Sequence, residues 1–378
     1  MRILVGGAGI GGLCFAVACR EQGMDVEVVE RLSRIDPVGA GIVLHPNGME
    51  VLQRLGLAQQ VRDLGTVLNT LVIHEREEPL RLSFEEIWAG ATQPSIAIAR
   101  SLLHEVLLKR LGPDGVRLVS GISTLRAVGE QVEVTLEDGR REQCELLVAA
   151  DGVHSSIRKA LGLGEPRQLG LWYWRFCTSA QLVPEDEWHS YPASRGHEGL
   201  SFGFIPLGQG LTHVFVQQVS EASPVSGQAE AEAWLQANAA RLSPLLERAW
   251  AARATGLHFG PAYELESHPW RSGHVAFLGD ASHAIAPTFS EGGSLAMEDA
   301  VVLARELAKH QGSGGLDAAL AAYEASRSER VKWAYRMAQQ QVRSLRRAAP
   351  RATPAQTPGT AHILEYLRCL YRPLLTPP

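Results

Sequence analysis

The stretch "RILVGGAGIGGLCFAVACREQGMDVEVVE" (residues 2–30) decides the fold. An apolar run suited to a buried strand, residues 2–6, leads into five glycines within the seven positions 6–12. A segment with helical spacing follows and stops at Gly23, and a second apolar run ends at Glu30. The order predicts a strand–helix–strand unit whose first turn is built for close approach of a ligand.

Each glycine of the pattern Gly7-x-Gly9-x-x-Gly12 has a physical use. Gly7 allows a tight turn, Gly9 lets a pyrophosphate approach the backbone, and Gly12 lets the helix pack closely on the strand. The helix N-terminus then presents free N–H groups to the anion. Glu30 ends the second strand, where a carboxylate accepts hydrogen bonds from a ribose. The pattern predicts an ADP-containing dinucleotide and leaves open which one.

Composition narrows the class of protein. The chain has 378 residues, enough for two joined domains, and a net charge of −5 without a basic block, which argues against nucleic acid or an anionic membrane surface as a partner. It has no run of about eighteen apolar residues, so no membrane span is predicted. The five cysteines are odd in number and show no C-x-x-C spacing, so we expect a reduced, cytoplasmic protein without disulfides. No group of residues has metal-ligand spacing.

The apolar strands that fit one sheet are discontinuous along the chain, at 2–6, 25–30, 145–150 and 273–278. The intervening segment 165–265 is strand-rich, and the chain after residue 315 is helical. We therefore predict an α/β fold: a discontinuous Rossmann-like domain (1–70, 96–165 and 270–345), an inserted antiparallel β-sheet substrate domain (71–95 and 166–269), and a C-terminal tail or helix (346–378).

Four further positions have the character of ligand contacts. Asp151 and Asp280 each follow an apolar strand, where a carboxylate can orient backbone N–H groups or bind a polyol. Gly292, Gly293 and Ser294 open a helix, so their N–H groups form a nest for an anion or a carbonyl oxygen. Arg100 begins another helix, where its charge is opposed by the helix dipole, so it is a candidate to reach a pyrophosphate or a bound ring.

Together the segments "GAGIGGL", "VVER", "GAGIVLHPN", "ADGVHSSIR" and "GDASHAIAP…EGG…AMEDA" resemble the single-component FAD-dependent aromatic hydroxylases. These are the class A flavoprotein monooxygenases of the salicylate, 6-hydroxynicotinate and urate hydroxylase type. The resemblance spans about residues 1–340. It implies an FAD-binding domain of the discontinuous GR2 type and FAD as the cofactor.

The resemblance also assigns residues. It places the pyrophosphate loop at 7–12, the ribose contact at Glu30, the ribityl contact at Asp280 and the flavin-ring loop at 292–293. The full set of implied cofactor contacts is Gly7, Gly9, Ile10, Gly11, Gly12, Glu30, Arg31, Gly41, Val43, Arg100, Leu125, Asp151, Asp280, Gly292, Gly293 and Ser294. One departure stands out, because many relatives carry Gly-Gln-Gly-Ala-Asn where this chain has Ser290-Glu291-Gly292-Gly293-Ser294.

The implied reaction uses NADH or NADPH as a transient co-substrate and dioxygen, and hydroxylates an aromatic or polycyclic small molecule through a flavin C4a-hydroperoxide. No metal is needed. A base that deprotonates a substrate hydroxyl would make the ring more nucleophilic. His45 and His213 are candidates for that base, and Arg175 and Tyr173 are candidates to face the substrate. Each of the four also has a purely structural interpretation.

Other classes fit less well. An NAD-dependent dehydrogenase would leave the Asp280 loop without a role. Flavin halogenases typically carry W-x-W-x-I-P, whereas here Trp172-Tyr173-Trp174 is followed by Arg175-Phe176. An FAD-dependent reductase or epoxidase of a non-aromatic substrate, and a non-catalytic flavoprotein ligand-binding module, stay open as alternatives. The sequence leaves open the substrate, the choice of nicotinamide cofactor, and whether the protein is a monomer or a homodimer.

Overall fold

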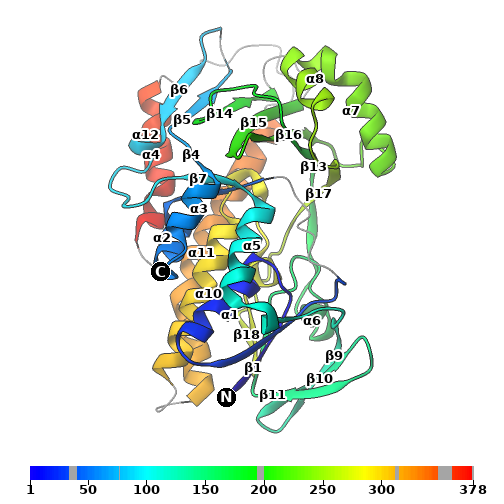
Figure 1. Ribbon diagram of the computed structural model, residues 1–378, viewed down its shortest axis with the longest axis vertical. Helices are drawn as coiled ribbons and strands as arrows, with labels where there is room; N and C mark the ends of the chain where they lie inside the picture. The colour runs from blue at the N-terminus through cyan, green and yellow to red at the C-terminus, as the bar shows by residue number, and fades with distance from the viewer. Residues whose placement is uncertain (34–40, 76, 194–199, 311–314, 348–359, 377–378) are drawn as a thin grey trace.

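A mainly parallel sheet forms the lower end of the molecule in Figure 1. The computed structural model describes residues 1–33, 41–75, 77–193, 200–310, 315–347 and 360–376. The sheet has the order β18 (Arg271–Ser272), β19 (Val275–Phe277), β12 (Leu146–Ala149), β1 (Arg2–Gly6), β2 (Asp25–Val29) and β8 (Val116–Arg117). All neighbours are parallel except β18 and β19. The prediction that four separated segments share one sheet is confirmed.

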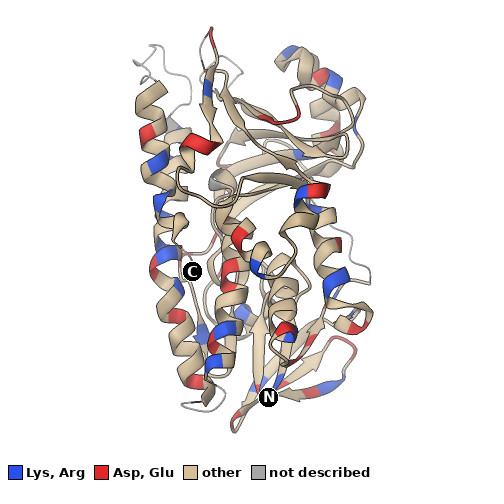
Figure 2. Cartoon of the chain, turned by 60° about the vertical axis from the view of Figure 1, so that its left-hand side comes forward, with Lys and Arg blue, Asp and Glu red and all other residues tan. Residues whose placement is uncertain are grey.

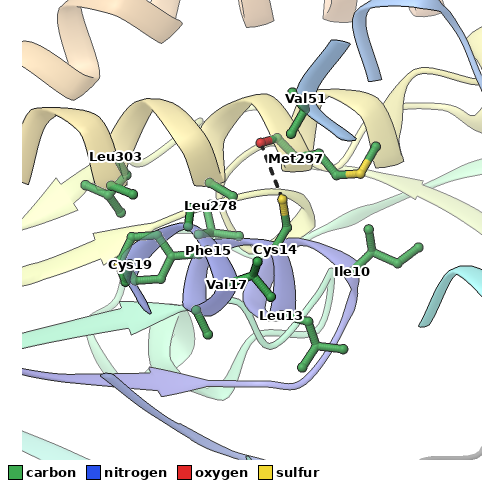
Figure 3. Close-up of a cluster of buried hydrophobic side chains, with 14 of the residues drawn as sticks. Ile10, Leu13, Cys14, Phe15, Val17, Cys19, Val51, Leu278, Met297 and Leu303 are labelled. Carbon is green, nitrogen blue, oxygen red and sulfur yellow. Dashed lines mark hydrogen bonds between the residues drawn. The ribbon is translucent and has the colours of Figure 1, made fainter. Parts of the chain in front are cut away.

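Helix α1 (Ile10–Glu21) lies at the centre of the nucleotide-binding half. Its first ten residues are buried because α10 (Gly292–Lys309) and α5 (Arg100–Leu111) both pack on it. Figure 3 shows the contact, with the Cys14 thiol directed at the carbonyl oxygen of Met297 at 3.9 Å. A Cβ at Gly11 would lie 2.7 Å from Leu278 Cδ1, so the small residues of α1 permit this close packing. The long helix α11 (Gly315–Arg347) covers α10.

A small antiparallel sheet extends from the parallel one. It contains β11 (Arg141–Cys144), β10 (Gln131–Leu136) and β9 (Ile122–Val128). Asp138 and Gly139 form the turn between β10 and β11, with Gly139 at φ +85°. Helix α6 (Ser156–Ala160) packs beside β9.

A seven-stranded sheet forms the upper end in Figure 1. Its order is β17 (His258–Glu264), β13 (Arg167–Thr178), β16 (Leu211–Val219), β15 (Leu200–Gly208), β14 (Glu187–Tyr191), β5 (Thr70–Ile73) and β6 (Leu80–Ser83). Helices α7 (Gln228–Leu242) and α8 (Pro244–Ala251) cover one face, against Trp174 and Phe176 of β13. The strands are those predicted for the substrate domain, whose boundaries stay a prediction.

A third set of short elements connects the two large sheets. It includes the strands β3 (Gly41–Leu44), β7 (Ile96–Ala99) and β4 (Thr66–Val67), which form one sheet. Beside it lie α2 (Pro46–Arg54), α3 (Ala58–Leu64), α4 (Phe84–Ile87), and the C-terminal elements α12 (Thr360–Tyr371) and η4 (Arg372–Leu375). Helix α12 packs on α4 and β6, and η4 packs on α2.

The surface and the cysteines agree with the composition. Positive and negative residues are interspersed along the outer helices in Figure 2. No helix within the described ranges is long and apolar enough to cross a membrane. All five cysteines are free thiols, four buried and Cys369 exposed.

Candidate functional site

The glycine loop between β1 and α1 has the geometry that its sequence predicts. Gly7 has φ +110°, and a Cβ there would lie 2.5 Å from the carbonyl oxygen of Ala150. A Cβ at Gly12 would overlap the carbonyl oxygen of Gly7. At Gly9, by contrast, the nearest atom to a Cβ would be 4.0 Å away. The fold itself therefore requires glycine at 7 and 12, whereas Gly9 leaves the backbone open on the side from which a ligand approaches.

The start of α1 is available to an anion. Its N-cap is Gly9, no side chain caps it, and its first turn has no acidic residue. Glu30 Oε2 accepts a 2.8 Å hydrogen bond from the amide of Ala8, and Oε1 accepts one of 3.1 Å from Leu32. Nε2 of His104 lies 2.6 Å from the carbonyl oxygen of Ala8. The loop is thus fixed from two sides while the amide groups at the helix start remain free for a pyrophosphate.

Two carboxylates lie at the carboxyl ends of β12, the neighbour of β1, and of β19, the next strand along. Asp151 follows β12, and its Oδ2 accepts hydrogen bonds from the amide of Ile157 (3.2 Å) and the hydroxyl of Ser156 (3.1 Å). Its Oδ1 is buried without a partner. Asp280 follows β19, begins α9 (Asp280–His283) and is exposed. The two turns are joined by Arg158, which donates to the carbonyl oxygens of Val153 (2.6 Å) and Ala281 (3.0 Å).

The start of α10 completes this edge. Asp280 Oδ1 lies 3.9 Å from the position of a Cβ on Gly292, and a Cβ on Gly293 would lie 2.6 Å from Ile42 Cδ1 of β3. Glu291 is the N-cap of α10 and makes no capping hydrogen bond with its side chain. The Oγ atom of Ser294 is buried without a partner. The amide groups of this helix start are therefore also free to bind a carbonyl oxygen or an anion.

Ser290 shows what the departure from the family pattern does to the backbone. Its φ and ψ are 54° and 20°, in the left-handed region where glycine is favoured. A serine in this conformation carries backbone strain that a glycine would not.

A dinucleotide such as FAD fits this arrangement. The open backbone at Gly9, the uncapped starts of α1 and α10, and the unpartnered Asp151 Oδ1 all lie at the carboxyl edge of the parallel strands, where ligands of such sheets bind. A surface hollow lined by Met1, Asp25, His274 and His310 lies at the opposite edge. It contains none of the predicted site residues, and we place the site at the carboxyl edge.

The remaining predicted cofactor contacts are less central. Arg100 begins α5 and is exposed, and Val43 is buried in β3. Gly41 is the first residue of β3, where a Cβ would lie 2.5 Å from Leu207 Cδ2 and 3.0 Å from His213 Cβ. Its small size therefore lets β3 approach the seven-stranded sheet. Leu125 lies apart in β9, in a shallow hollow with Thr124, Arg126 and Arg141, and its adenine contact stays a prediction.

The substrate-facing candidates share one face of the seven-stranded sheet. On β13, Trp174 and Phe176 point to α7 and α8, so the alternate residues Tyr173 and Arg175 point the other way. The Arg175 guanidinium lies 4.2 Å from the centre of the Tyr173 ring. His213 on β16 pairs with Cys177 and is on the same face. Tyr173, Arg175 and His213 are three of the four candidates named from the sequence.

Burial sets the charge of these groups. It raises the pKa of Tyr173 to about 12, so the phenol stays protonated. It lowers the pKa of His213 to about 3, helped by the charge of Arg175, so the imidazole stays neutral. Burial also lowers the pKa of Arg175 from its ordinary value, with the like charge of Arg100 acting in the same direction.

His45, the other candidate base, belongs to a different neighbourhood. It is the N-cap of α2, and its Nδ1 lies 3.1 Å from Ser95 Oγ. Its ring centre lies 5.0 Å from that of Trp88 and 5.5 Å from that of Tyr371. Burial lowers the pKa of His45 to about 3. The contacts of His45 are thus with α4 and α12, whereas His213 contacts β3 at Gly41.

Sequence reasoning missed a buried polar network under the start of α10. The amide of Asn47 donates 3.0 Å hydrogen bonds to Glu291 Oε2 and Glu298 Oε1. Arg327 pairs with Glu298 (2.8 Å) and with Asp299 (2.7 Å). Charged residues at core positions of the "AMEDA" segment were the available signal, since buried charges need partners.

The same network supports the Asp280 turn. Asp299 Oδ2 accepts from the amide of Gly279 (2.9 Å) and lies 2.5 Å from His283 Nε2. Burial opposes ionisation of Asp299, but the charges of His283 and Arg327 outweigh it and lower its pKa to about 2. His283 is buried in this pair.

Known proteins share this arrangement over nearly the whole chain. Residues 1–338 match the family described as FAD binding domain. The chain is 32% identical to the aurachin C monooxygenase/isomerase of Stigmatella aurantiaca, over 90% of this chain and 89% of that protein. It is 30% identical to the FAD-dependent urate hydroxylase of Klebsiella pneumoniae, over 88% and 87% of the two chains.

A solved structure agrees with the sequence relatives. The crystal structure of Klebsiella pneumoniae HpxO complexed with FAD and uric acid superposes with a TM-score of 0.82 at 25% identity, covering 99% of this chain and 95% of that one. The chain therefore belongs to the FAD binding domain family, among the FAD-dependent hydroxylases and monooxygenases of aromatic or heterocyclic compounds, and its cofactor is FAD.

Proposed function

We propose that the protein uses NADH or NADPH and dioxygen to hydroxylate an aromatic or polycyclic small molecule. The observation that carries the proposal is the position of β3. Ile42 of this strand packs where a Cβ on Gly293 would be, and Gly41 packs against Leu207 and His213. The strand thus lies between the start of α10 and the face of the seven-stranded sheet that carries Tyr173 and Arg175. A flavin ring bound at the start of α10 would therefore be next to a substrate bound on that face of the seven-stranded sheet.

The chain's own residues would hold FAD. The α1 start would bind the pyrophosphate, Glu30 the adenosine ribose, and Asp280 the ribityl chain. The amide groups of residues 292–294 would lie at the carbonyl end of the flavin ring, where they stabilise negative charge. Bound FAD supplies the electron transfer and oxygen transfer, which no side chain of the protein can provide.

The protein's part in the reaction is binding, orientation and exclusion of water. Tyr173, Arg175 and His213 would form the wall of the substrate site. A neutral imidazole whose pKa is about 3 is a weak proton acceptor. We therefore expect neither His213 nor His45 to act as the base, and the substrate's ionisation must be favoured by other means.

The test is flavin reduction in the holoenzyme. The purified protein is mixed anaerobically with NADH or NADPH, alone and with a panel of phenols, heteroaromatic acids and polycyclic phenols, while absorbance is followed at the flavin band. A hydroxylase shows fast bleaching with one class of compound, and aerobic turnover then gives a product heavier by one oxygen atom. A yellow protein that neither nicotinamide reduces would contradict the proposal and favour a ligand-binding flavoprotein. The cytoplasmic location and the monomeric or homodimeric state stay predictions.

A further inference from the structure

Glu291 is a fully buried carboxyl group at the start of α10 that takes no part in the function proposed above. It is the N-cap of this helix, but its side chain makes no capping hydrogen bond. Its Oε2 atom accepts the 3.0 Å hydrogen bond from the amide of Asn47, and its Oε1 atom is buried without a partner. Within the described residues, that hydrogen bond is the only polar contact of the side chain. One oxygen atom of the carboxyl group is therefore free to carry a proton.

The charged groups beneath Glu291 pair with one another and leave it without a cation. Two carboxylates, Glu298 and Asp299, face the two guanidinium groups of Arg327 and Arg330. Glu291 is a third carboxyl group, and among the described residues no positive group forms an ion pair with it. A buried charge without a partner is costly. Ionisation of Glu291 would therefore add a negative charge that the network does not neutralise.

Groups from α2, α11 and α12 also interact with Glu291. Burial, the largest cause, raises the pKa of Glu291 well above its ordinary value, and the like charge of Glu298 acts in the same direction. The hydrogen bond from Asn47 of α2 and the positive charge of Arg330 of α11 favour the ionised form. Tyr371 of α12 is an uncharged neighbour, because burial and then the charge of Glu291 raise the pKa of Tyr371 above its ordinary value. Ionisation of Glu291 is thus shifted towards alkaline pH.

Glu291 adjoins the place where the flavin ring would bind. Gly292 and Gly293 are partly exposed, whereas Glu291 before them and Ser294 after them are buried. We placed the carbonyl end of the flavin ring at the amide groups of residues 292–294. Two-electron reduction of FAD adds negative charge to that end of the ring. Like charges disfavour each other, so negative charge on the ring and negative charge on Glu291 would oppose one another.

We propose that Glu291 is a redox-linked proton acceptor: at alkaline pH its carboxylate takes up a proton from solvent when the bound FAD is reduced. The inference rests on the proposed function, since it places the flavin ring at the start of α10. At acid pH Glu291 already holds its proton, so reduction adds two electrons and one proton to FAD. Where Glu291 is ionised, reduction adds two electrons and two protons, and the second proton goes to the Glu291 carboxylate. The electrons come from the reductant, which is NADH or NADPH in the proposed reaction.

This proton makes the midpoint potential of FAD depend more steeply on pH. Each proton that is bound together with two electrons makes reduction tenfold less favourable per pH unit, which lowers the potential by about 30 mV. Glu291 adds one such proton over the pH range in which it is ionised beside oxidised FAD and protonated beside reduced FAD. Reduction therefore becomes less favourable at alkaline pH than the flavin alone requires.

The test is a potentiometric titration of the FAD-loaded protein with dithionite and indicator dyes, for the wild type and E291Q at pH 5.5 to 9.5. Glutamine keeps the shape of the side chain and the acceptor for Asn47, but it does not ionise. The midpoint potentials of the two proteins should run parallel at acid pH. Towards alkaline pH the wild-type potential should fall relative to that of E291Q by at least about 30 mV, which is a tenfold change in the reduction equilibrium.

E306Q is the matched control. Glu306 is also a buried carboxyl group of α10, but it lies about 22 Å further along the helix, at about 1.5 Å per residue. The same substitution there leaves the start of the helix intact. E306Q should follow the wild type at every pH.

Proton uptake by the wild type is a second measurement, and it needs no variant. The holoenzyme is reduced electrochemically in weakly buffered solution that contains a pH indicator. It should take up more protons per FAD at alkaline pH than at acid pH, by up to one, whereas FAD by itself takes up no more protons as the pH rises. If E291Q does not retain FAD, this measurement decides.

Two results overturn the inference: potentials of wild type and E291Q that run parallel over the whole pH range, or a proton uptake by the wild type that does not rise with pH. Failure of the proposed function looks different. A protein whose potentials diverge as expected but which neither NADH nor NADPH reduces keeps the proton acceptor and loses the hydroxylase proposal. A protein that hydroxylates a compound while the potentials run parallel keeps the hydroxylase proposal and loses the proton acceptor.

Discussion

The side-chain amide of Asn47 lies 3.0 Å from Glu291 and fixes this fully buried carboxyl group at the start of α10. The same amide nitrogen donates to Glu298, which is paired with Arg327 and Arg330. Burial raises the pKa of Glu291 well above its ordinary value, and the charge of Glu298 adds to the effect. Glu291 is therefore a neutral acid within the fold.

This relationship predicts a pH-dependent stability. The folded protein keeps the Glu291 proton that the unfolded chain releases near pH 4.5, so stability falls as the pH rises from 4.5 towards the raised pKa. The E291Q variant has no ionisable group at this position, so it lacks this contribution to the pH dependence of stability. Within that window the stability difference between wild type and E291Q should change by about 1.4 kcal/mol per pH unit, in favour of E291Q at higher pH. Urea denaturation at pH 5, 6, 7 and 8 measures it. Parallel stability curves for the two proteins would show that Glu291 is ionised in the fold.

Asp299 is predicted to be the most costly carboxylate to remove. It pairs with Arg327 and His283 and accepts from the amide of Gly279, all in the buried interior. D299N leaves Arg327 without that counter-charge and should cost about 3–5 kcal/mol of unfolding free energy. It should also weaken FAD binding, because the Gly279–Asp280 turn loses its support.

Denaturant unfolding and flavin fluorescence measure the two effects of D299N. E329Q, in the exposed pair with Lys332, is the control and should leave the stability nearly unchanged. Because the pKa of Asp299 is about 2, below the ordinary 3.8, its contribution is present above pH 3.8 and is lost as the pH falls towards 2. A D299N protein as stable as E329Q would contradict the network's role.

The glycine loop could be predicted from sequence because its constraints are local. The roles of Gly7 and Gly12 follow from the turn between adjacent elements, and the overlaps that a Cβ would meet at these positions agree with those roles. That four separated apolar runs share one sheet was also predictable. The packing of Gly41 was not, because Leu207 and His213, which a Cβ there would approach, are distant in the chain.

The buried network was beyond prediction for a related reason. Asn47 and Glu291 are 244 residues apart, and Asp299 and Arg327 lie on different helices. Nothing in the spacing of "HPN" or "SEGGS" indicates that they meet. On β13 only the packing of α7 and α8 on Trp174 and Phe176 shows which face is free for a ligand.

Substitutions at Gly9 and Gly12 distinguish the contact with the ligand from the close packing that the fold requires. G9A should leave the stability of the apoprotein unchanged within about 0.5–1 kcal/mol, since its Cβ has space, but should weaken FAD binding at least about tenfold by blocking the pyrophosphate. G12A should destabilise the apoprotein by more than about 2 kcal/mol, because its Cβ overlaps the Gly7 carbonyl. Thermal unfolding of the apoprotein and FAD titration measure both, with G256A, which has open space around its Cβ, as the control. Equal FAD affinity in G9A and G256A would remove Gly9 from the cofactor site.

Ser290 offers a stabilising substitution. Its left-handed backbone, at φ 54°, costs a serine about 1–2 kcal/mol relative to glycine, less the entropy that glycine loses on folding. S290G should therefore raise the unfolding free energy by up to about 1 kcal/mol and raise the melting temperature. G210A, at φ +69° in the β15–β16 turn, is the converse control and should lower it. A lower stability for S290G would mean that the serine side chain makes a compensating contact.

His213 provides a kinetic test of how the substrate is ionised. Its pKa of about 3 keeps it neutral at every pH above about 4, so the acid limb of a pH–rate profile measured from pH 5 to 9 cannot come from this residue. With the compound that accelerates flavin reduction, H213N should keep the shape of the profile and lose less than about tenfold in kcat/KM, whereas removal of a true general base costs about 100- to 10,000-fold. The control is the FAD absorbance of purified H213N. If it is retained, the variant has not lost FAD through damage to the contact between His213 and Gly41. A loss above about 100-fold together with a shifted acid limb would restore His213 as the base.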